Sequence, residues 1–252
     1  MLGVVIERSR KRAIVILKGF RCRWGRCVFC PFFLEAGNSL SDVIQTNDKI
    51  LSLLEDATLR FSIERITVFN GGSFFELPLD TVLKLSRFTC GRIVDIESRP
   101  EYLSFDSVRQ VLELLKPSRL VIRVGIEVWD EYLRNAVLCK GIPQSEIVRL
   151  NALREKCREV YGDEVSFIAY ILFGIELIPE SKVVESVEEL SKYFDGIIAV
   201  QYRRVLDSLP SEAIPSRELI LYLQQKCVDV DLKRSDESEW CFTGEVRYVI
   251  AD

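Results

Sequence analysis

Short apolar runs alternate with longer amphipathic segments along most of the chain. Apolar runs of about four to eight residues are typical of buried strands, and apolar residues recurring every three or four positions are typical of helices that cover a core. The pattern predicts strands at 13–17, 63–69, 92–97, 120–126, 165–173 and 196–201, and a last strand at 246–250. It predicts helices between them, the first capped by Ser41 or Asp42 and running to about 61, the others at 79–87, 105–115, 145–161, 180–193 and 218–226. Such alternation builds a parallel sheet with right-handed crossovers.

Six strand–helix units are fewer than the eight that close a (β/α)8 barrel. The periodicity fits a partial (β/α)6 barrel of the TIM type and, equally, a doubly wound open sheet. In both architectures ligands bind at the carboxyl ends of the strands. The unusual residues of this chain fall there: three cysteines after the first strand, Gly71-Gly-Ser73 after the second, Glu97-Ser-Arg99 after the third and Glu127 after the fourth.

Composition narrows the class of protein. The chain has 252 residues, 48% of them hydrophobic, which is ample for a core, and we expect a core domain at 1–205 with a C-terminal helix–strand extension at 206–252 packed on it. Within that extension we expect the charged stretch 229–239 to face solvent. Residues 8–12 are charged where a signal peptide would be apolar, and no apolar run approaches the roughly 18 residues of a bilayer span. We therefore expect a cytoplasmic protein, whose cysteines are metal ligands or catalytic groups before they are disulfides.

Three of the eight cysteines lie within nine residues, at Cys22, Cys27 and Cys30. The segments between them are short, so little loop-closure entropy opposes their convergence on one metal centre. Thiolates favour iron–sulfur clusters, zinc or Cu(I), and structural zinc needs four ligands that a chain without histidine is poorly equipped to supply. Three cysteines on a four-iron cluster leave one iron open to another ligand. Structural zinc and three inert buried thiols are the alternatives.

The other cysteines are widely spaced and are expected to be ordinary core residues; they are Cys90, Cys139, Cys157, Cys227 and Cys241. Among them, Cys227 and Cys241 are the one pair to consider for a second metal site.

The cysteine spacing, with Phe29 directly before the last cysteine, resembles the cluster loop of the radical S-adenosylmethionine (SAM) superfamily. That family's pattern is Cys-x3-Cys-x2-Cys, and this chain has one extra residue between Cys22 and Cys27. The longer spacing is similar to that of the archaeosine synthase radical SAM subunit and the Elongator catalytic subunit. The resemblance implies an archaeal-like radical SAM core built as a partial TIM-type barrel, with a 4Fe–4S cluster on Cys22, Cys27 and Cys30. It also implies SAM as a second cofactor and a ferredoxin or flavodoxin as electron donor.

Two further segments continue this resemblance. Gly71, Gly72 and Ser73 occupy the place of the family's glycine-rich motif, whose carbonyl groups hold the amino group of SAM, although many members have an acid where this chain has Ser73. Glu97-Ser98-Arg99 matches a Glu-Ser-Arg-Pro-Glu segment that supplies polar contacts to SAM, and a guanidinium can bind a carboxylate through two hydrogen bonds. The plainer interpretations are a simple glycine turn and a surface ion pair between Glu97 and Arg99.

The fourth strand ends in Gly125-Ile-Glu127, with Lys140-Gly141 downstream, again as in the family. The resemblance implies that Glu127 contacts the ribose hydroxyl groups and that Lys140 holds the SAM carboxylate. A carboxylate at the end of an apolar strand must be compensated, so the alternative is that Lys140 or Arg123 pairs with Glu127 in the absence of a ligand. Lys140 is otherwise a charge flanking a helix.

The net charge of −4 argues against nucleic-acid recruitment by bulk electrostatics. Seven cations nevertheless surround the cysteines in the sequence, and we expect them to cluster near the cysteine segment; they are Arg8, Arg10, Lys11, Arg12, Arg21, Arg23 and Arg26. They would meet an anionic substrate or a phosphate backbone, or else form a solvated basic edge.

The resemblance implies an enzyme that cleaves SAM to a 5′-deoxyadenosyl radical, with modification of a tRNA base of the archaeosine type as one candidate reaction. The tRNA would be bound directly or through a partner subunit, without a membrane. Two other classes stay open: a non-catalytic iron–sulfur protein for electron transfer or structure, and a metal-free α/β module that binds a nucleotide at the Gly71-Gly72 turn.

Overall fold

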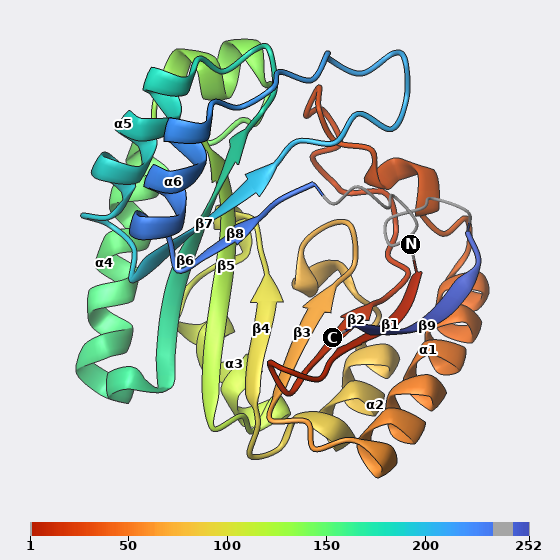
Figure 1. Ribbon diagram of the computed structural model, residues 1–252. Coiled ribbons are helices and arrows are strands. Elements are labelled where there is room, and N and C mark those ends of the chain that lie inside the picture. The colour runs from red at the N-terminus through yellow and green to blue at the C-terminus, as the bar shows by residue number, and fades with distance from the viewer. Residues whose placement is uncertain (1, 234–243, 252) are drawn as a thin grey trace.

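A computed structural model describes residues 2–233 and 244–251. Within these residues, nine strands form one curled sheet in the order β8-β7-β6-β5-β4-β3-β2-β1-β9 (Figure 1). The strands are β1 (Leu2–Glu7), β2 (Arg12–Ile16), β3 (Arg65–Phe69), β4 (Ile93–Glu97), β5 (Arg119–Glu127), β6 (Val165–Phe173), β7 (Gly196–Gln201), β8 (Asp229–Asp231) and β9 (Val246–Ala251). The helices are α1 (Leu40–Arg60), α2 (Leu79–Thr89), α3 (Phe105–Leu115), α4 (Gln144–Tyr161), α5 (Glu180–Leu190) and α6 (Arg217–Lys226).

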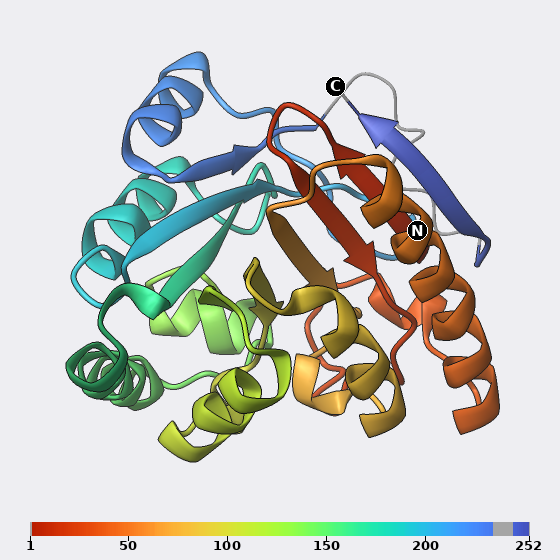
Figure 2. The same cartoon turned by 90° about the horizontal axis from the view of Figure 1, so that it is seen from below.

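Strands β2 to β8 run parallel to one another, and a helix follows each of β2 to β7. Seen along the strands, the helices form an arc on the outside of the curled sheet, from α1 in orange to α6 in blue (Figure 2). The prediction of a partial barrel is confirmed, and the open-sheet alternative is wrong. The boundary predicted at residue 205 stays a prediction.

Two strands were missing from the predicted pattern. Strand β1 pairs antiparallel with β2 through a tight turn at residues 8–11, and β9 pairs with its other edge. Strand β8 has three residues, two of them aspartates, and pairs with β7. Residues 229–231 of the stretch predicted to face solvent are half-buried at this edge, with the Asp231 side chain 42% exposed, and the part of the stretch from 234 lies outside the described residues. Short edge strands with charged side chains carry little hydrophobic signal.

The helices begin and end close to their predicted positions because their apolar spacing and end residues are strong. In α3, Ser104 caps the first turn, and Val108, Val111 and Leu115 are buried against the sheet. The cap of α1 is an exception: Ser39, and neither Ser41 nor Asp42, accepts the hydrogen bond from the Asp42 amide at 3.1 Å. Serine favours this position because its hydroxyl satisfies an otherwise unpaired N–H group.

Alternate residues of each strand face either the helices or the concave side of the sheet. In β5, Leu120, Ile122 and Val124 belong to the core beneath the helices, whereas Val121 joins a small apolar cluster with Ile168 of β6 and Ile198 of β7. Further along β4, β5 and β6, this face carries Asp95, Arg123 and Tyr170.

Asp95 of β4 is fully buried between Arg65, which donates two hydrogen bonds at 2.7 and 2.6 Å, and Arg123 at 3.1 Å. Burial opposes ionisation of Asp95, but the Arg65 and Arg123 guanidinium groups outweigh it and lower the pKa of this carboxyl. The concave face is therefore charged at its centre.

No helix in the described part of the chain is long and apolar enough to cross a bilayer. Of the cysteines expected in the core, Cys157 is buried, Cys139 and Cys227 are partly exposed, and Cys90 is exposed at the end of α2, so its prediction is wrong. Cys241 lies outside the described residues, and the predicted pairing with Cys227 is therefore untested.

Candidate functional site

The three clustered cysteines lie on the segment between β2 and the 3₁₀ turn at Phe32–Glu35, here called the cysteine loop (18–31). Cys22, Cys27 and Cys30 are all partly exposed, and none forms a disulfide. The Cys30 amide donates a hydrogen bond to the Cys27 carbonyl at 3.3 Å, which turns the two residues together. The loop follows the carboxyl end of β2, where the sequence predicted a ligand site.

Electrostatics show that the thiols share one environment with charged groups from β4 and β5. Burial raises the pKa of the Cys27 thiol, and the nearby Lys140 and Arg99 cations act in the opposite direction. Burial, together with the charges of Cys27 and Cys22, raises the pKa of Cys30 to about 11. The Lys140 charge therefore acts on both Cys27 and Cys30, and the Arg99 charge acts on Cys27.

The donor set of the cysteine loop is made of thiols alone, which suits soft metals and iron–sulfur clusters. Among the described residues, no three His, Cys, Asp or Glu side chains are placed as they would be around a single metal ion. A four-iron cluster is larger than one ion, and three unpaired, partly exposed thiols on one short loop fit it chemically. The assignment of Cys22, Cys27 and Cys30 as cluster ligands stays a prediction.

The Gly71-Gly72 turn after β3 lies directly beside the cysteine loop. A Cβ atom on Gly72 would be 3.8 Å from the Cys22 Cα and 2.5 Å from Oε2 of Glu76, so a larger residue there would have to displace the Glu76 carboxylate. Gly71 has a φ of +70°, which favours glycine for a second reason.

Glu76 was missed by the sequence reasoning and connects these segments. Its carboxylate accepts hydrogen bonds from the amide of Ser73 at 2.8 Å, the amide of Arg23 at 2.8 Å and the hydroxyl of Tyr102 at 3.0 Å. The carboxylate thus joins the glycine turn to the cysteine loop. A serine followed three residues later by glutamate is a capping-box signal that would have identified Ser73 and Glu76 as partners.

Arg99, after β4, is held from several sides and is only 10% exposed. Its Nε donates to Glu101 at 2.5 Å and its Nη1 donates to the carbonyl of Lys140 at 3.0 Å, while its guanidinium lies 4.9 Å from the centre of a Trp24 ring. The ion pair weighed between Arg99 and Glu97 is not formed, because Glu101 takes that place.

Ser73 and Ser98 hold the backbone around Arg99. Ser73 is fully buried, and its hydroxyl accepts a hydrogen bond from the Arg99 amide at 2.8 Å. The Ser98 hydroxyl donates to the Arg99 carbonyl at 2.9 Å. In the structure the side chains of both serines therefore form hydrogen bonds with main-chain groups of Arg99.

Glu97, the last residue of β4, turns to the concave face of the sheet. There it forms a hydrogen bond with Tyr170 of β6, whose hydroxyl also accepts a hydrogen bond from Nη1 of Arg123 at 2.9 Å. Burial raises the pKa of Glu97 to about 7, although the Arg123 cation opposes the shift. Nε of Arg123 is buried and has no hydrogen-bond partner. Tyr170 and Arg123 were not predicted site residues, since tyrosine and arginine in apolar strands carry no motif.

Glu127 and Lys140 form a nearly buried ion pair of 2.6 Å at the carboxyl end of β5. A bulge between Gly125 and Glu127 places Glu127 in a left-handed conformation with φ of +71°, a strain that is typical of functional sites. A Cβ atom on Gly125 would lie 2.6 Å from Oε1 of Glu127 and 2.8 Å from Nζ of Lys140. Lys140 Nζ also lies 5.7 Å from the centre of the Phe29 ring. The prediction that Lys140 compensates Glu127 is confirmed.

The residues from β5 to α4, here called the lysine loop (128–143), are organised by one buried arginine. Arg134 is fully buried and donates to the carbonyls of Ile142, Val128 and Trp129 and to the amide oxygen of Gln144, at 2.7 to 2.9 Å. It lies in a π-helical segment, Leu133–Val137, a feature frequent at functional sites. No local signal distinguishes Arg134 from a surface arginine.

The cysteine loop packs on the lysine loop. The Val28 amide donates to the Leu138 carbonyl at 3.2 Å, and the Trp24 indole N–H donates to the Cys139 carbonyl at 2.7 Å. A Cβ atom on Gly141 would overlap the Trp24 ring at 2.0 Å. The thiols therefore reach the Glu127–Lys140 pair because the two loops interlock.

Comparison with known proteins shows what this arrangement resembles. A scan of protein families finds no match. Archaeosine synthase subunit beta of Methanosarcina acetivorans is 26% identical over 202 residues, which cover 74% of this chain and 56% of that protein. An uncharacterized protein of Methanocaldococcus jannaschii is 26% identical over 203 residues, covering 72% of this chain and 52% of that protein. The chain spans about half the length of the curated relatives it matches.

Among solved structures, the queuine lyase from Clostridium spiroforme bound to SAM and queuine has a TM-score of 0.62 and 23% identity, covering 95% of this chain and 91% of that one. Streptococcus suis SuiB bound to SAM has a TM-score of 0.58 and 12% identity, covering 97% of this chain and 58% of that one. The chain resembles the radical SAM superfamily. At these identities the solved structures show that the chain has the radical SAM fold.

Within the radical SAM fold, the predicted site residues fall into two groups. Those that meet around the cysteine loop are Phe29, Gly71, Gly72, Ser73, Ser98, Arg99, Glu127 and Lys140, together with the three thiols. Glu97 lies slightly apart, on the concave face, although the charges of Lys140 and Glu127 still act on it.

The prediction that seven cations cluster near the cysteines is wrong for four of them. Arg8, Arg10, Lys11 and Arg12 lie at the turn between β1 and β2, one strand length or about 16 Å from the cysteine loop. Three of the four are paired with acids: Arg10 with Asp229, Lys11 with Glu64 and Arg12 with Glu7.

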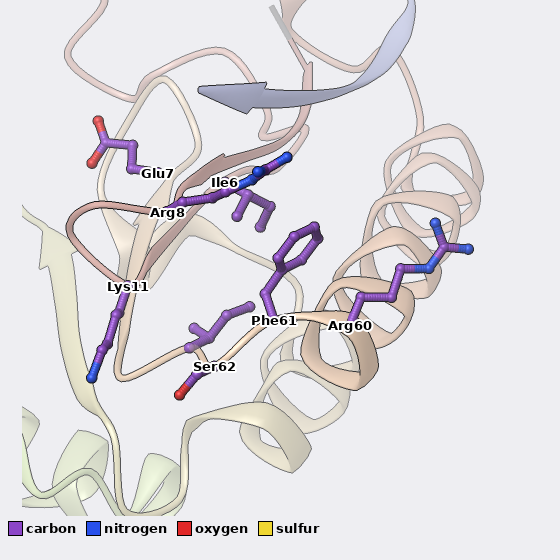
Figure 3. Close-up of a pocket in the computed structure, with 8 residues that line it drawn as sticks. Ile6, Glu7, Arg8, Lys11, Arg60, Phe61 and Ser62 are labelled. Atoms are coloured by element: carbon purple, nitrogen blue, oxygen red, sulfur yellow. The ribbon is translucent and has the colours of Figure 1, made fainter. Parts of the chain in front are cut away.

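Arg8, Lys11, Arg60 and Phe61 line a pocket of about 290 Å³ at this far end (Figure 3). Sequence neighbours on opposite ends of a strand cannot act on one ligand, so only Arg21, Arg23 and Arg26 remain beside the thiols.

Proposed function

We propose that this chain is a radical SAM enzyme that holds a 4Fe–4S cluster on Cys22, Cys27 and Cys30. The observation that carries the proposal is the meeting of three unpaired thiols with the Glu127–Lys140 pair, Arg99 and Gly72 at the carboxyl end of a parallel half barrel. When bound, such a cluster supplies the electron that splits SAM into methionine and a 5′-deoxyadenosyl radical, which abstracts a hydrogen atom from the substrate.

The chain's own residues would bind and orient SAM beside the cluster. The carbonyl groups of the Gly71-Gly72 turn would accept hydrogen bonds from the amino group of SAM, because the turn lies directly beside the cysteine loop, with the Cβ position of Gly72 3.8 Å from the Cys22 Cα. Lys140 and the remaining donors of Arg99 would hold the SAM carboxylate, and Glu127 would accept hydrogen bonds from the ribose. Glu127 keeps Lys140 charged, since its carboxylate outweighs the effect of burial and raises the pKa of Lys140.

For the substrate, we propose a modified tRNA base of the archaeosine type. Two relationships support this: one relative is named archaeosine synthase subunit beta, and one structural neighbour was solved with queuine, which is also a modified base. On the concave face, Glu97, Tyr170 and Arg123 offer donors and acceptors side by side, and a carboxyl group with a pKa of about 7 can do either. Such a set suits the polar edge of a heterocyclic base. Because one relative is named as a subunit, the tRNA would be delivered by a partner subunit or bound directly.

The cluster and the chemistry are tested together. The chain is reconstituted anaerobically with iron and sulfide, iron is counted, and 5′-deoxyadenosine is measured after addition of SAM and dithionite. We expect a cluster and nucleoside formation in the native chain, neither in Cys27→Ala, and both in the matched control Cys90→Ala, whose thiol is exposed far from the site. A cluster without nucleoside would identify a structural or electron-transfer protein. A native chain that forms neither the cluster nor 5′-deoxyadenosine would be identified as a metal-free binding module.

The substrate is tested separately by adding unfractionated archaeal tRNA or queuine to the same reaction. We expect added tRNA to increase the rate of 5′-deoxyadenosine formation at least several-fold. We also expect one base of the tRNA to change in mass, which is measured after digestion of the tRNA to nucleosides. If tRNA leaves both unchanged while the uncoupled reaction proceeds, the tRNA assignment is wrong and the radical chemistry stands.

A further inference from the structure

The pocket at the end of the sheet opposite the cysteine loop is built by three neighbouring segments. We call it the far-end pocket; its lining residues are 6–8, 11 and 60–63, from β1, the turn at 8–11 and the end of α1 with the segment after it. The amides of Glu64 and Arg65 both donate to the Lys11 carbonyl, at 2.9 and 3.2 Å, and join the turn to the segment after α1. Main-chain hydrogen bonds therefore fix the walls of the pocket.

The floor of the far-end pocket is apolar. Ile6 and Ile63 are buried, and the half-buried Phe61 lies beside them. Figure 3 shows the Phe61 ring between the Arg8 side chain, which comes from the end of β1, and the Arg60 side chain, which comes from the last turn of α1. The pocket thus combines apolar surface with two guanidinium groups from different elements.

These two arginines are exposed and lack acidic partners. Within residues 2–233 and 244–251, neither the Arg8 nor the Arg60 side chain forms an ion pair or a hydrogen bond. The Arg8 guanidinium lies over the Phe61 ring, 5.8 Å from its centre. Contact with the face of a ring uses none of the N–H donors of a guanidinium, so Arg8 and Arg60 keep theirs for a ligand.

The other charged groups that line the far-end pocket are already neutralised. Glu7 accepts a hydrogen bond from Arg12 at 2.6 Å, and Lys11 donates to Glu64 at 2.5 Å. The pocket therefore keeps two uncompensated positive charges in a chain whose net charge is −4. Paired guanidinium groups of this kind suit the oxygens of a phosphate or a carboxylate.

We propose that the far-end pocket binds a small organic phosphate of about mononucleotide size, whose phosphate group is held by Arg8 and Arg60. A phosphate monoester carries close to two negative charges at neutral pH and so matches two cations, whereas a carboxylate carries one. The volume of about 290 Å³ is at the lower end of the range for ligand pockets, which limits the ligand to a single small unit. Binding is non-covalent. The inference does not depend on the proposed function, because the pocket and the thiols lie at opposite ends of β2.

The surroundings favour a small molecule over an RNA backbone. A phosphate backbone is held by a series of unpaired cations, whereas the cations that flank this pocket are paired with acids, Arg10 with Asp229 and Lys11 with Glu64. Arg8 and Arg60 alone would make a short track. The apolar floor gives no advantage to a backbone phosphate, but it can cover the body of a small ligand.

Binding is tested by calorimetric titration of the full chain at about 50 mM salt. The probes are adenosine 5′-monophosphate, uridine 5′-monophosphate, ribose 5-phosphate, inorganic phosphate and adenosine. We expect at least one organic phosphate to bind at least tenfold more tightly than inorganic phosphate, and adenosine to bind at least tenfold more weakly than its monophosphate. Raising the salt to about 300 mM should weaken phosphate binding, because exposed charges are screened.

Two variants with the same net charge assign the binding to the pocket. Arg8→Gln/Arg60→Gln should bind the organic phosphate at least tenfold more weakly, because the charge-assisted hydrogen bonds are lost. The matched control Arg109→Gln/Arg217→Gln removes two exposed arginines elsewhere, on α3 and α6, and should bind as the native chain does. All three proteins should unfold at nearly the same urea concentration without ligand, since each substitution is at the surface.

Stability supplies a second readout. A ligand that binds only the folded chain stabilises it by mass action, so a saturating organic phosphate should raise the urea midpoint of the native and control proteins and leave that of Arg8→Gln/Arg60→Gln unchanged. Three results would overturn the inference. The first is that no organic phosphate binds more tightly than inorganic phosphate, and the second is equal binding by the variant and the native chain. The third is loss of short single-stranded RNA binding by the variant when no mononucleotide competes for it, which would make the pocket an RNA contact.

Discussion

Two loops meet at the candidate site, and they are stabilised in opposite ways. The lysine loop is held from within, because Arg134 is fully buried and satisfies four acceptors belonging to that loop and the start of α4. The cysteine loop has little internal bonding: it depends on Glu76, which accepts from the Arg23 amide, and on carbonyl groups of the lysine loop. Its thiols are partly exposed, and none forms a disulfide.

The difference suggests which half of the site exists before any cofactor binds. The Glu127–Lys140 pair is complete in the protein alone, so the lysine loop acts as the preorganised half. The cysteine loop would gain its remaining stabilisation from a cluster, as metal sites generally couple binding to local folding. Removing contacts from each loop in turn tests this contrast, and the predictions run from the largest expected effect on unfolding free energy to the smallest.

Arg134→Met should be the most damaging change. It leaves the carbonyls of Val128 and Trp129 buried without this donor and removes one of the two donors to the Ile142 carbonyl, so we expect a loss of about 4 kcal/mol of unfolding free energy, measured by urea denaturation of the cluster-free protein. Arg109→Met, on the exposed side of α3, is the control and should change stability by less than about 0.5 kcal/mol. If the two variants were equally stable, the lysine loop would not be organised by its arginine.

Lys140→Met should cost about 3 kcal/mol, because it leaves the Glu127 carboxylate nearly buried and uncompensated. The double variant Glu127→Gln/Lys140→Met should recover at least half of that loss, since no unpaired charge remains. A double-mutant cycle on unfolding free energies measures the coupling. A double variant no more stable than Lys140→Met would show that the pair does not act as a unit.

Glu97 gives the site a dependence on pH. Its pKa is about 7 in the folded protein and 4.5 ordinarily, so the folded state binds this proton more tightly than the unfolded state. The associated stability is fully present below pH 4.5 and is lost as pH rises through 7. Between pH 4 and pH 8, the native chain should therefore lose about 2 to 3 kcal/mol relative to Glu97→Gln, in which the group cannot ionise. Unfolding free energies of both proteins across this range provide the measurement, and parallel curves would contradict the prediction.

Trp24→Phe should have the smallest effect, about 1 kcal/mol, because it removes one hydrogen bond between the two loops and keeps most of the packing. Its larger consequence should be a lower iron content after reconstitution, since the cysteine loop is less well held. Trp129→Phe, whose ring stacks on Tyr193 away from the thiols, is the matched control and should keep its iron. Equal iron contents would show that the loop contact is not needed for cluster assembly.

The sequence by itself determined the order of the elements and most of the site. Apolar periodicity records which face of each strand or helix is buried, so strands such as Val165–Phe173 were predicted with their observed bounds. Motifs that resemble those of the radical SAM family predicted the three cysteines, Gly72, Arg99, Glu127 and Lys140 as site residues, and the structure brings these segments together. Strand β8 escaped because three residues at the margin of the sheet have weak periodicity, whereas β1, which lies between β2 and β9, is an apolar strand that was not recognised.

Only the tertiary structure decided which polar groups became partners. Glu76 reaches Arg23 across 53 positions, and Arg123 reaches Tyr170 across 47. Those pairs depend on strand register and on how loops pack, and neither is encoded in any local pattern. For the same reason, Arg8 to Arg12 were separated from the thiols: five residues of extended strand carry neighbours in sequence to opposite ends of the sheet.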